Sequence, residues 1–101
     1  MKLIERYFEE WNGGGQKEII ARADDGTETS LAKNYIGYDE FSHGVSIEWH
    51  LTARIKEDPR GILVQIEHYN IRSGYTFYEP NWDNAICYLS TDQGKTWTSI
   101  K

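Results

Sequence analysis

The sequence predicts an α+β fold, in which one N-terminal amphipathic helix packs on a mostly antiparallel, meander-like sheet of about five to seven strands. Three observations support this prediction. Apolar residues stand at helical spacing before residue 12, apolar and polar residues alternate without exception from Val45 to Lys56, and turn residues separate the later apolar runs. Because 101 residues is the length of one domain, we expect residues 1–101 to form a single domain.

Residues 1–12 are the expected helix. Their apolar residues lie three or four positions apart with charged residues between them, and are Leu3, Ile4, Tyr7, Phe8 and Trp11. Residues 13–15 are all glycine, which loses too much backbone entropy in a helix, so this run should end the helix and act as a spacer. Residues 16–101 are expected to be antiparallel β-sheet, because β-branched and aromatic residues dominate their apolar runs.

Several strands are expected on either side of the clearest one. The pair Asp25-Gly26 between two apolar runs predicts a tight hairpin with a type I′ turn. Segment 32–43 is expected to be an irregular strand, and shorter strands are expected at 75–78 and 84–89. A final hairpin then completes the meander.

The alternating strand 45–56 predicts a hairpin with a defined register. If residues 58–61 form the turn, Thr52 faces Glu67 and His50 faces Tyr69 in the returning strand. His50, Arg54 and Glu67 then share one solvent-facing side of the sheet. A glutamate, a histidine and an arginine in this arrangement can serve as general base, general acid and phosphate clamp for RNA cleavage.

The composition excludes some classes of function. Sixteen Asp and Glu against eleven Lys and Arg give a net charge of −5, which disfavours binding to nucleic acid by bulk electrostatics and favours a basic partner protein. The histidines and the single cysteine lack metal-ligand spacing, and no glycine-rich loop precedes a helix, so we expect neither metal nor cofactor. Cys87 cannot form an internal disulfide, which favours the cytoplasm. Charges interrupt the first six residues, so we expect neither an export signal nor membrane insertion.

Residues 90–97 fit the pattern S-x-D-x-G-x-T-W, which resembles an Asp-box, the turn also called a BNR repeat. The resemblance assigns structural roles to Ser90, Asp92, Gly94 and Trp97. Asp92 should accept hydrogen bonds from nearby backbone amides, Gly94 should adopt a positive φ, and Trp97 should pack back under the turn. Sialidases and related propellers carry this motif once in each blade, so a single copy indicates a turn and not a catalytic site.

The last fourteen residues, 88–101, resemble the C-terminal hairpin of barnase-type microbial ribonucleases. In that family, the residue after the hairpin's aspartate is the catalytic histidine, whereas this chain has Gln93 there. The resemblance implies RNA cleavage, with His50 replacing the missing acid and with Glu67 and Arg54 completing the site. We keep this activity as the enzymatic alternative.

The main hypothesis is a small, acidic protein-binding module that is not an enzyme and that inhibits or neutralises its partner, as toxin-immunity proteins and phage inhibitors of host defence do. A tryptophan in a loop with acidic neighbours is typical of an interface hot spot. The expected contact residues are Trp82, Glu79, Asp83 and Tyr78, with a second patch at Tyr38, Asp39 and Glu40.

Three alternatives to this interface stay open. Trp82 could instead fold back onto the sheet as a lid on the core. A small ligand or carbohydrate could bind an aromatic sheet face made by Trp49, Tyr69, Tyr75 and Tyr78. Exposed aromatic residues on an edge strand could also mark a homodimer seam.

Overall fold

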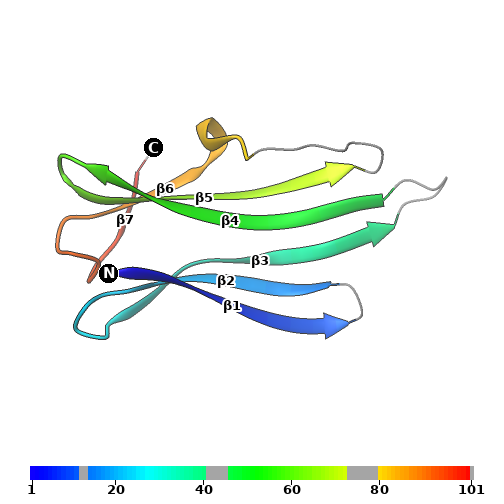
Figure 1. The fold of residues 1–101 in the computed structure, drawn as a ribbon, viewed down its shortest axis with the longest axis horizontal. Coiled ribbons are helices and arrows are strands. Elements are labelled where there is room, and N and C mark those ends of the chain that lie inside the picture. The colour runs from blue at the N-terminus through cyan, green and yellow to red at the C-terminus, as the bar shows by residue number, and fades with distance from the viewer. Residues whose placement is uncertain (12–13, 41–45, 73–79, 101) are drawn as a thin grey trace.

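The computed structural model describes residues 1–11, 14–40, 46–72 and 80–100. They form one seven-stranded antiparallel sheet whose strands follow each other in chain order (Figure 1). The strands are β1 (Lys2–Trp11), β2 (Gly14–Arg22), β3 (Glu28–Glu40), β4 (Ser46–Asp58), β5 (Gly61–Arg72), β6 (Ile86–Ser90) and β7 (Thr98–Ile100), with a short 3-10 helix, η2 (Trp82–Asn84), before β6. The fold is an all-β meander, so the expected α+β class is wrong.

The expected N-terminal helix is strand β1, which pairs with β2 from Lys2 opposite Arg22 onward. In a strand, neighbouring residues point to opposite faces, so the apolar pairs at positions 3–4 and 7–8 supply one residue to each face. The same spacing imitates a helical stripe. Gly14 and Gly15, which were expected to help end a helix, instead begin β2, where a Cβ on Gly15 would clash with the carbonyl oxygen of Phe8.

The hairpin at Asp25-Gly26 is confirmed, but its turn type is wrong. The amide of Gly26 donates to the carbonyl of Ala23 at 3.0 Å, and Gly26 has a φ of +91° while Asp25 has no positive φ. A type I′ turn needs positive φ at both central residues, so Asp24 and Asp25 instead form the centre of a turn that Gly26 completes. The irregular strand expected at 32–43 is part of β3, and the strand expected at 75–78 lies outside the described residues.

The predicted β4–β5 register is confirmed. Thr52 faces Glu67, His50 faces Tyr69, and Asp58 faces Gly61 at the turn. Asp58 closes this turn by accepting hydrogen bonds from the backbone amide and the guanidinium of Arg60, both at 2.9 Å. These bonds lower the pKa of Asp58 to about 2.

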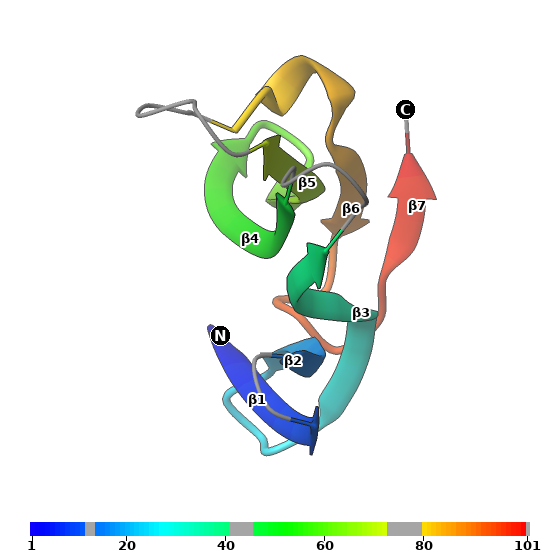
Figure 2. The same ribbon diagram turned by 90° about the vertical axis from the view of Figure 1, so that its right-hand side faces the viewer.

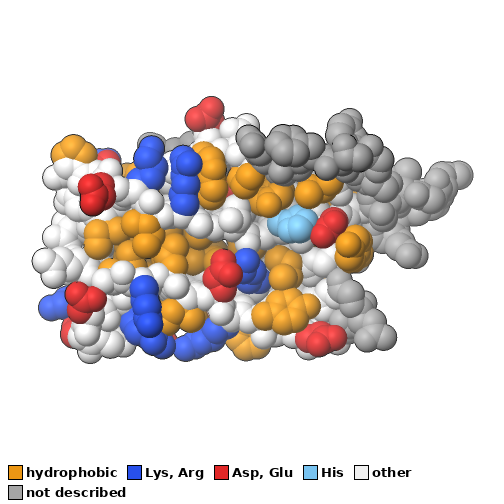
Figure 3. Space-filling view, in the orientation of Figure 1, with side chains coloured by type: hydrophobic (Ala, Val, Ile, Leu, Met, Phe, Trp, Pro, Cys, Tyr) orange, Lys and Arg blue, Asp and Glu red, His pale blue; other side chains and the backbone are white. Residues whose placement is uncertain are grey.

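The sheet folds on itself because β3 and β4 pair over only a short stretch, from Gly37 opposite Trp49 to Glu40 opposite Ser46. Beyond it, the β1–β3 half and the β4–β7 half diverge (Figures 1 and 2). The core fills the space between the halves and consists of Ile19, Ala21, Leu31, Leu51, Val64 and Ile66. Figure 3 shows hydrophobic side chains gathered in a band between β3 and β4. Lys17 of β2 links the halves by donating to the carbonyl oxygen of Leu51 at 2.8 Å.

The turn between β6 and β7 has the contacts that the S-x-D-x-G-x-T-W pattern predicts. Asp92 accepts hydrogen bonds from the Thr96 amide at 2.9 Å and from the Ser90 hydroxyl at 2.8 Å. Gly94 has a φ of +93°, and the indole of Trp97 donates to its carbonyl oxygen at 3.1 Å while packing against the core. The hydrogen bonds from Thr96, and then that from Ser90, lower the pKa of Asp92 to about 2.

Candidate functional site

A hollow on the described surface lies where β5 continues beyond its pairing with β6. That pairing ends at Ile66 opposite Ile86, and the chain of β6 arrives there from the η2 turn. The hollow has a volume of about 490 Å³. Its lining residues are Asn34, Ile66, Glu67, His68, Tyr69, Asn70, Asn84 and Ile86. We call this site the Glu67 hollow.

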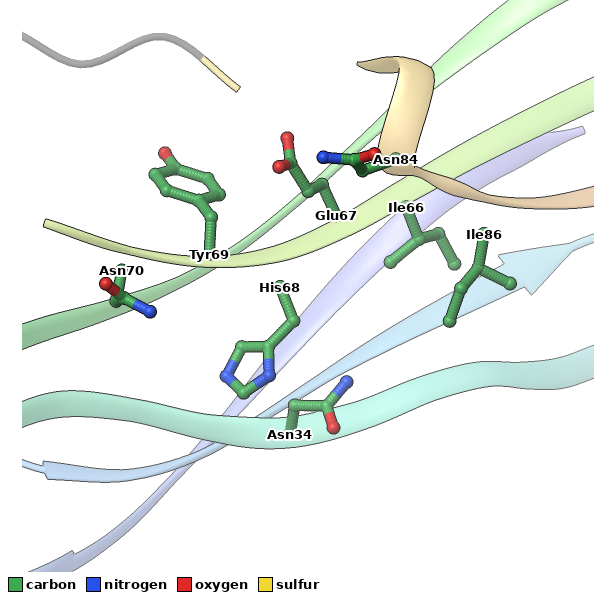
Figure 4. A pocket seen from close by; sticks show the side chains of 8 residues that line it. All are labelled: Asn34, Ile66, Glu67, His68, Tyr69, Asn70, Asn84 and Ile86. Carbon is green, nitrogen blue, oxygen red and sulfur yellow. The ribbon is translucent and has the colours of Figure 1, made fainter. Parts of the chain in front are cut away.

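Glu67 is the unusual residue of this site. It is only 7% exposed, and its buried Oε2 atom has no hydrogen-bond partner among the described residues. Burial raises the pKa of Glu67, and a hydrogen bond from the backbone of Asn81 partly opposes that rise. Figure 4 shows Glu67 and Tyr69 projecting from the same side of β5, with the Asn84 amide beside the Glu67 carboxylate. A buried carboxylate in this state can accept a donor group that enters the hollow.

The other side of the hollow is polar as well. Figure 4 shows His68 projecting away from Glu67 toward Asn34 of β3. The Nε2 atom of His68 lies 2.7 Å from the carbonyl oxygen of Tyr35, and the ring lies 4.8 Å from that of Trp49. His68 of β5 therefore contacts the backbone of β3 at this point.

The η2 turn lies over Glu67, to which the Asn81 backbone donates, and its ends are capped. The side chain of Asn81 accepts a hydrogen bond from the amide of Asp83 at 3.1 Å, and the amide of Asn84 donates to the carbonyl of Asn81 at 3.0 Å. Trp82 is half-buried, with the guanidinium of Arg54 lying 4.3 Å from its ring centre. Trp82 thus lies against an outward residue of β4, while Asp83 stays exposed beside the hollow.

The predicted cluster of Glu67, His50 and Arg54 shares one sheet face, as the register requires. The three side chains do not form one hydrogen-bonded group. Arg54 donates to Gln65 at 2.7 Å. His50 stacks on Tyr69 at 5.3 Å, and its Nε2 lies 3.1 Å from Glu48 without hydrogen-bond geometry. Glu67 is therefore the member of the cluster that faces the hollow.

The remaining predicted contact residues have different positions. Tyr38 is 57% exposed on β3. Asp39 and Glu40 lie opposite Ile47 and Ser46 in the β3–β4 pairing, and their side chains lie outside the described part. Tyr78 and Glu79 also lie outside the described residues, as does Tyr75 of the proposed aromatic face.

The aromatic sheet face expected for a carbohydrate is not formed by Trp49 and Tyr69 together. Trp49 faces Asn70 and Tyr69 faces His50 across β4 and β5, so the two aromatic residues lie on opposite faces and cannot build one carbohydrate platform. Sequence reasoning missed Asn34 and Asn84 as lining residues. The run Asn81-Trp82-Asp83-Asn84, rich in capping residues, was the signal for a turn that could carry a polar group over the sheet.

Other features of the described residues bear on function. No three histidine, cysteine, aspartate or glutamate residues in the described ranges gather in a way that could hold a metal ion. Within the same ranges, no helix is both long enough and apolar enough to span a membrane. No family model, curated protein or solved structure matches this chain. The geometry of the Glu67 hollow is therefore the main support for a function.

Proposed function

We propose that this chain is a small, acidic, cytoplasmic module that binds a basic partner protein and neutralises it by occupying its surface, as toxin-immunity proteins and phage inhibitors of host defence do. One observation carries the proposal. Glu67 is 7% exposed, has no described partner for one carboxylate oxygen and lines an open hollow of about 490 Å³. A lysine or arginine side chain of the partner would supply the missing charge.

The energetics of Glu67 favour this arrangement. A buried polar atom without a partner destabilises a folded protein by about 1–3 kcal/mol, so such atoms are rare unless something pairs with them. A guanidinium offers five N–H donors, enough to pair with the carboxylate and with amide oxygens of nearby asparagines such as Asn84. The net charge of −5 would attract a basic surface toward the site.

The η2 turn would form the rim of this interface. Asp83 is exposed next to Asn84 and adds negative charge at the edge of the hollow. Trp82 is half-buried under the Arg54 guanidinium, where it supports the turn and leaves part of its ring open to a partner. Tyr38, which is 57% exposed, is a second proposed contact.

Affinity capture with matched variants tests the proposal. The tagged wild-type chain, Glu67→Gln and the exposed-site control Glu57→Gln would each be mixed with a lysate at moderate salt. We expect the wild type and Glu57→Gln to retain one basic protein in near-equal amount, and Glu67→Gln to bind it about thirty-fold more weakly, the loss typical of an interface hot spot. Equal retention by all three chains, or retention by none, would refute it.

RNA cleavage is the second candidate function, because Glu67, whose pKa is raised by burial, shares one sheet face with His50 and Arg54. This activity is measured with purified protein and single-stranded RNA between about pH 5 and pH 8. Cleavage that disappears in Glu67→Gln would establish the enzyme. If the purified wild type leaves the RNA intact at every pH, the binding function stands alone.

A further inference from the structure

Strand β1 is the first strand of the sheet, and its outer edge has no strand partner among the described residues. Figure 1 shows no described ribbon below the second half of β1, whereas the turn between β6 and β7 lies near its start, where Gly94 approaches Met1. The strand is ten residues long, and Tyr7 and Phe8 on it are 55% and 42% exposed. Because a long edge presents a row of backbone donors and acceptors, it is a template for pairing with another strand.

The charges of β1 are arranged for pairing with its own copy. Lys2 lies at its start, and Glu9 and Glu10 lie near its end. When two identical strands pair antiparallel about a twofold axis, one residue must face its own copy. The regular part of β1 runs from Lys2 to Glu9, and Glu10 is the bulged residue before Trp11. Pairing of residues 2–10 with the same residues of a copy is centred on Arg6.

We propose that β1 pairs antiparallel with β1 of a second copy, centred on Arg6, so that the sheet continues across a symmetric dimer. This register places Lys2 opposite Glu10 and Ile4 opposite Phe8, once on each side of the axis. Opposite charges and an aliphatic–aromatic pair both stabilise neighbouring strands. Arg6 faces its copy, and each guanidinium already has a counter-charge, since its Nη2 lies 3.0 Å from Glu28 of the same chain.

Centring the pairing one residue earlier or later is less favourable. Centring on Tyr7 would place Glu5 opposite Glu9, which are like charges, and would leave Lys2 without a facing acid. Centring on Glu5 would place that glutamate opposite its own copy and Lys2 opposite Phe8. Of these three registers, the proposed one is the one that places opposite charges, Lys2 and Glu10, at the ends of the paired segment.

Disulfide trapping tests the register in a Cys87→Ser background. Residues that face each other across paired strands have Cα atoms about 4.5–5.5 Å apart, within the range of a disulfide. Arg6→Cys should therefore form a covalent dimer under mild oxidation. Phe8→Cys should not, because its copy would lie roughly 13 Å along the strand. A mixture of Ile4→Cys and Phe8→Cys chains should cross-link to each other.

Sedimentation of the native-cysteine chain gives the independent readout. The wild type should be a dimer, Lys2→Glu should dissociate about tenfold more readily, and Lys2→Glu combined with Glu10→Lys should return to the wild-type dissociation constant. Lys56→Glu on β4 makes the same change in net charge away from β1 and should leave the dimer intact. A monomeric wild type, or cross-linking of Phe8→Cys as efficient as that of Arg6→Cys, would overturn the proposal.

Discussion

Replacing Gly61 by alanine should be among the most damaging small substitutions in this chain. Gly61 begins β5 with a φ of +151°, and an added Cβ would lie 2.1 Å from the carbonyl oxygen of Ser90 and 3.1 Å from its carbonyl carbon. Both atoms belong to the backbone of β6, so no side chain can rotate away. Because ordinary contact begins at 3.4 Å, the two strands would have to separate by about 1.3 Å.

The expected loss of stability follows from two contributions. A positive φ costs an alanine about 1–2 kcal/mol. Separating the strands weakens the first hydrogen bonds of the β5–β6 ladder, beside Ile62 opposite Ser90, at about 1 kcal/mol for each bond. We therefore expect Gly61→Ala to lower the free energy of unfolding by about 3–4 kcal/mol. The site would suffer too, because β6 carries the η2 turn that covers Glu67.

Gly26 provides the matched control. It has a φ of +91°, but an added Cβ would meet nothing within 4 Å. Gly26→Ala should therefore lose only the conformational contribution, about 1–2 kcal/mol. Urea unfolding followed by tryptophan fluorescence measures both variants against the wild type. If Gly61→Ala is no less stable than Gly26→Ala, the close approach of Gly61 to β6 is wrong.

Three further predictions concern the two turns and the Glu67 hollow. Hydrogen bonds lower the folded-state pKa of Asp92 to about 2 from 3.8. The stability that its charge supplies is therefore present above about pH 4 and lost as the pH falls through 2. In urea titrations, Asp92→Asn should be less stable than the wild type at pH 7, and this difference in stability should shrink as the pH falls from about 4 to about 2. Burial raises the pKa of Glu67, so ionisation of Glu67 should destabilise the fold as the pH rises above 4.5. Glu67→Gln should therefore be about 1 kcal/mol more stable than the wild type at pH 7, and this difference should disappear below pH 4. A variant that is less stable than the wild type at pH 7 would contradict the burial argument. Trp82→Ala should stay folded but weaken partner binding by about 2 kcal/mol in a calorimetric titration, and unchanged affinity would remove Trp82 from the interface.

The sequence predicts local features of this fold well because their causes are local. Strict alternation over 45–56 and a four-residue turn determined the β4–β5 register residue by residue. The Asp-box pattern likewise predicted the contacts of Asp92 and Trp97, since all of them lie within eight residues. In both cases, the residues that decide the geometry are neighbours in the chain.

The sequence misled where long-range contacts decide. In β1, the apolar spacing fits a helix and a two-sided strand equally well, and pairing with β2 selects the strand. Glu67 falls on the polar side of the β4–β5 hairpin, so periodicity predicts a solvated carboxylate. The η2 turn buries it, and nothing in the alternation of β5 indicates that residues 80–84 pack there.

The two proposed surfaces are compatible because they lie on different parts of the sheet. Strand β1 is at one end of the strand order, whereas the Glu67 hollow is formed mainly by β5, β6 and η2, with β3 contributing Asn34. A dimer joined through β1 would leave both hollows open and would present them as a symmetric pair. Linked sites raise the effective concentration for a second binding event, so such a dimer would hold an oligomeric or repetitive basic partner much more tightly than one hollow could. Weakening the dimer with Lys2→Glu should then reduce the affinity for a multivalent partner but leave the affinity for a partner with a single basic site unchanged. If β1 instead contacted the partner directly, both affinities would fall.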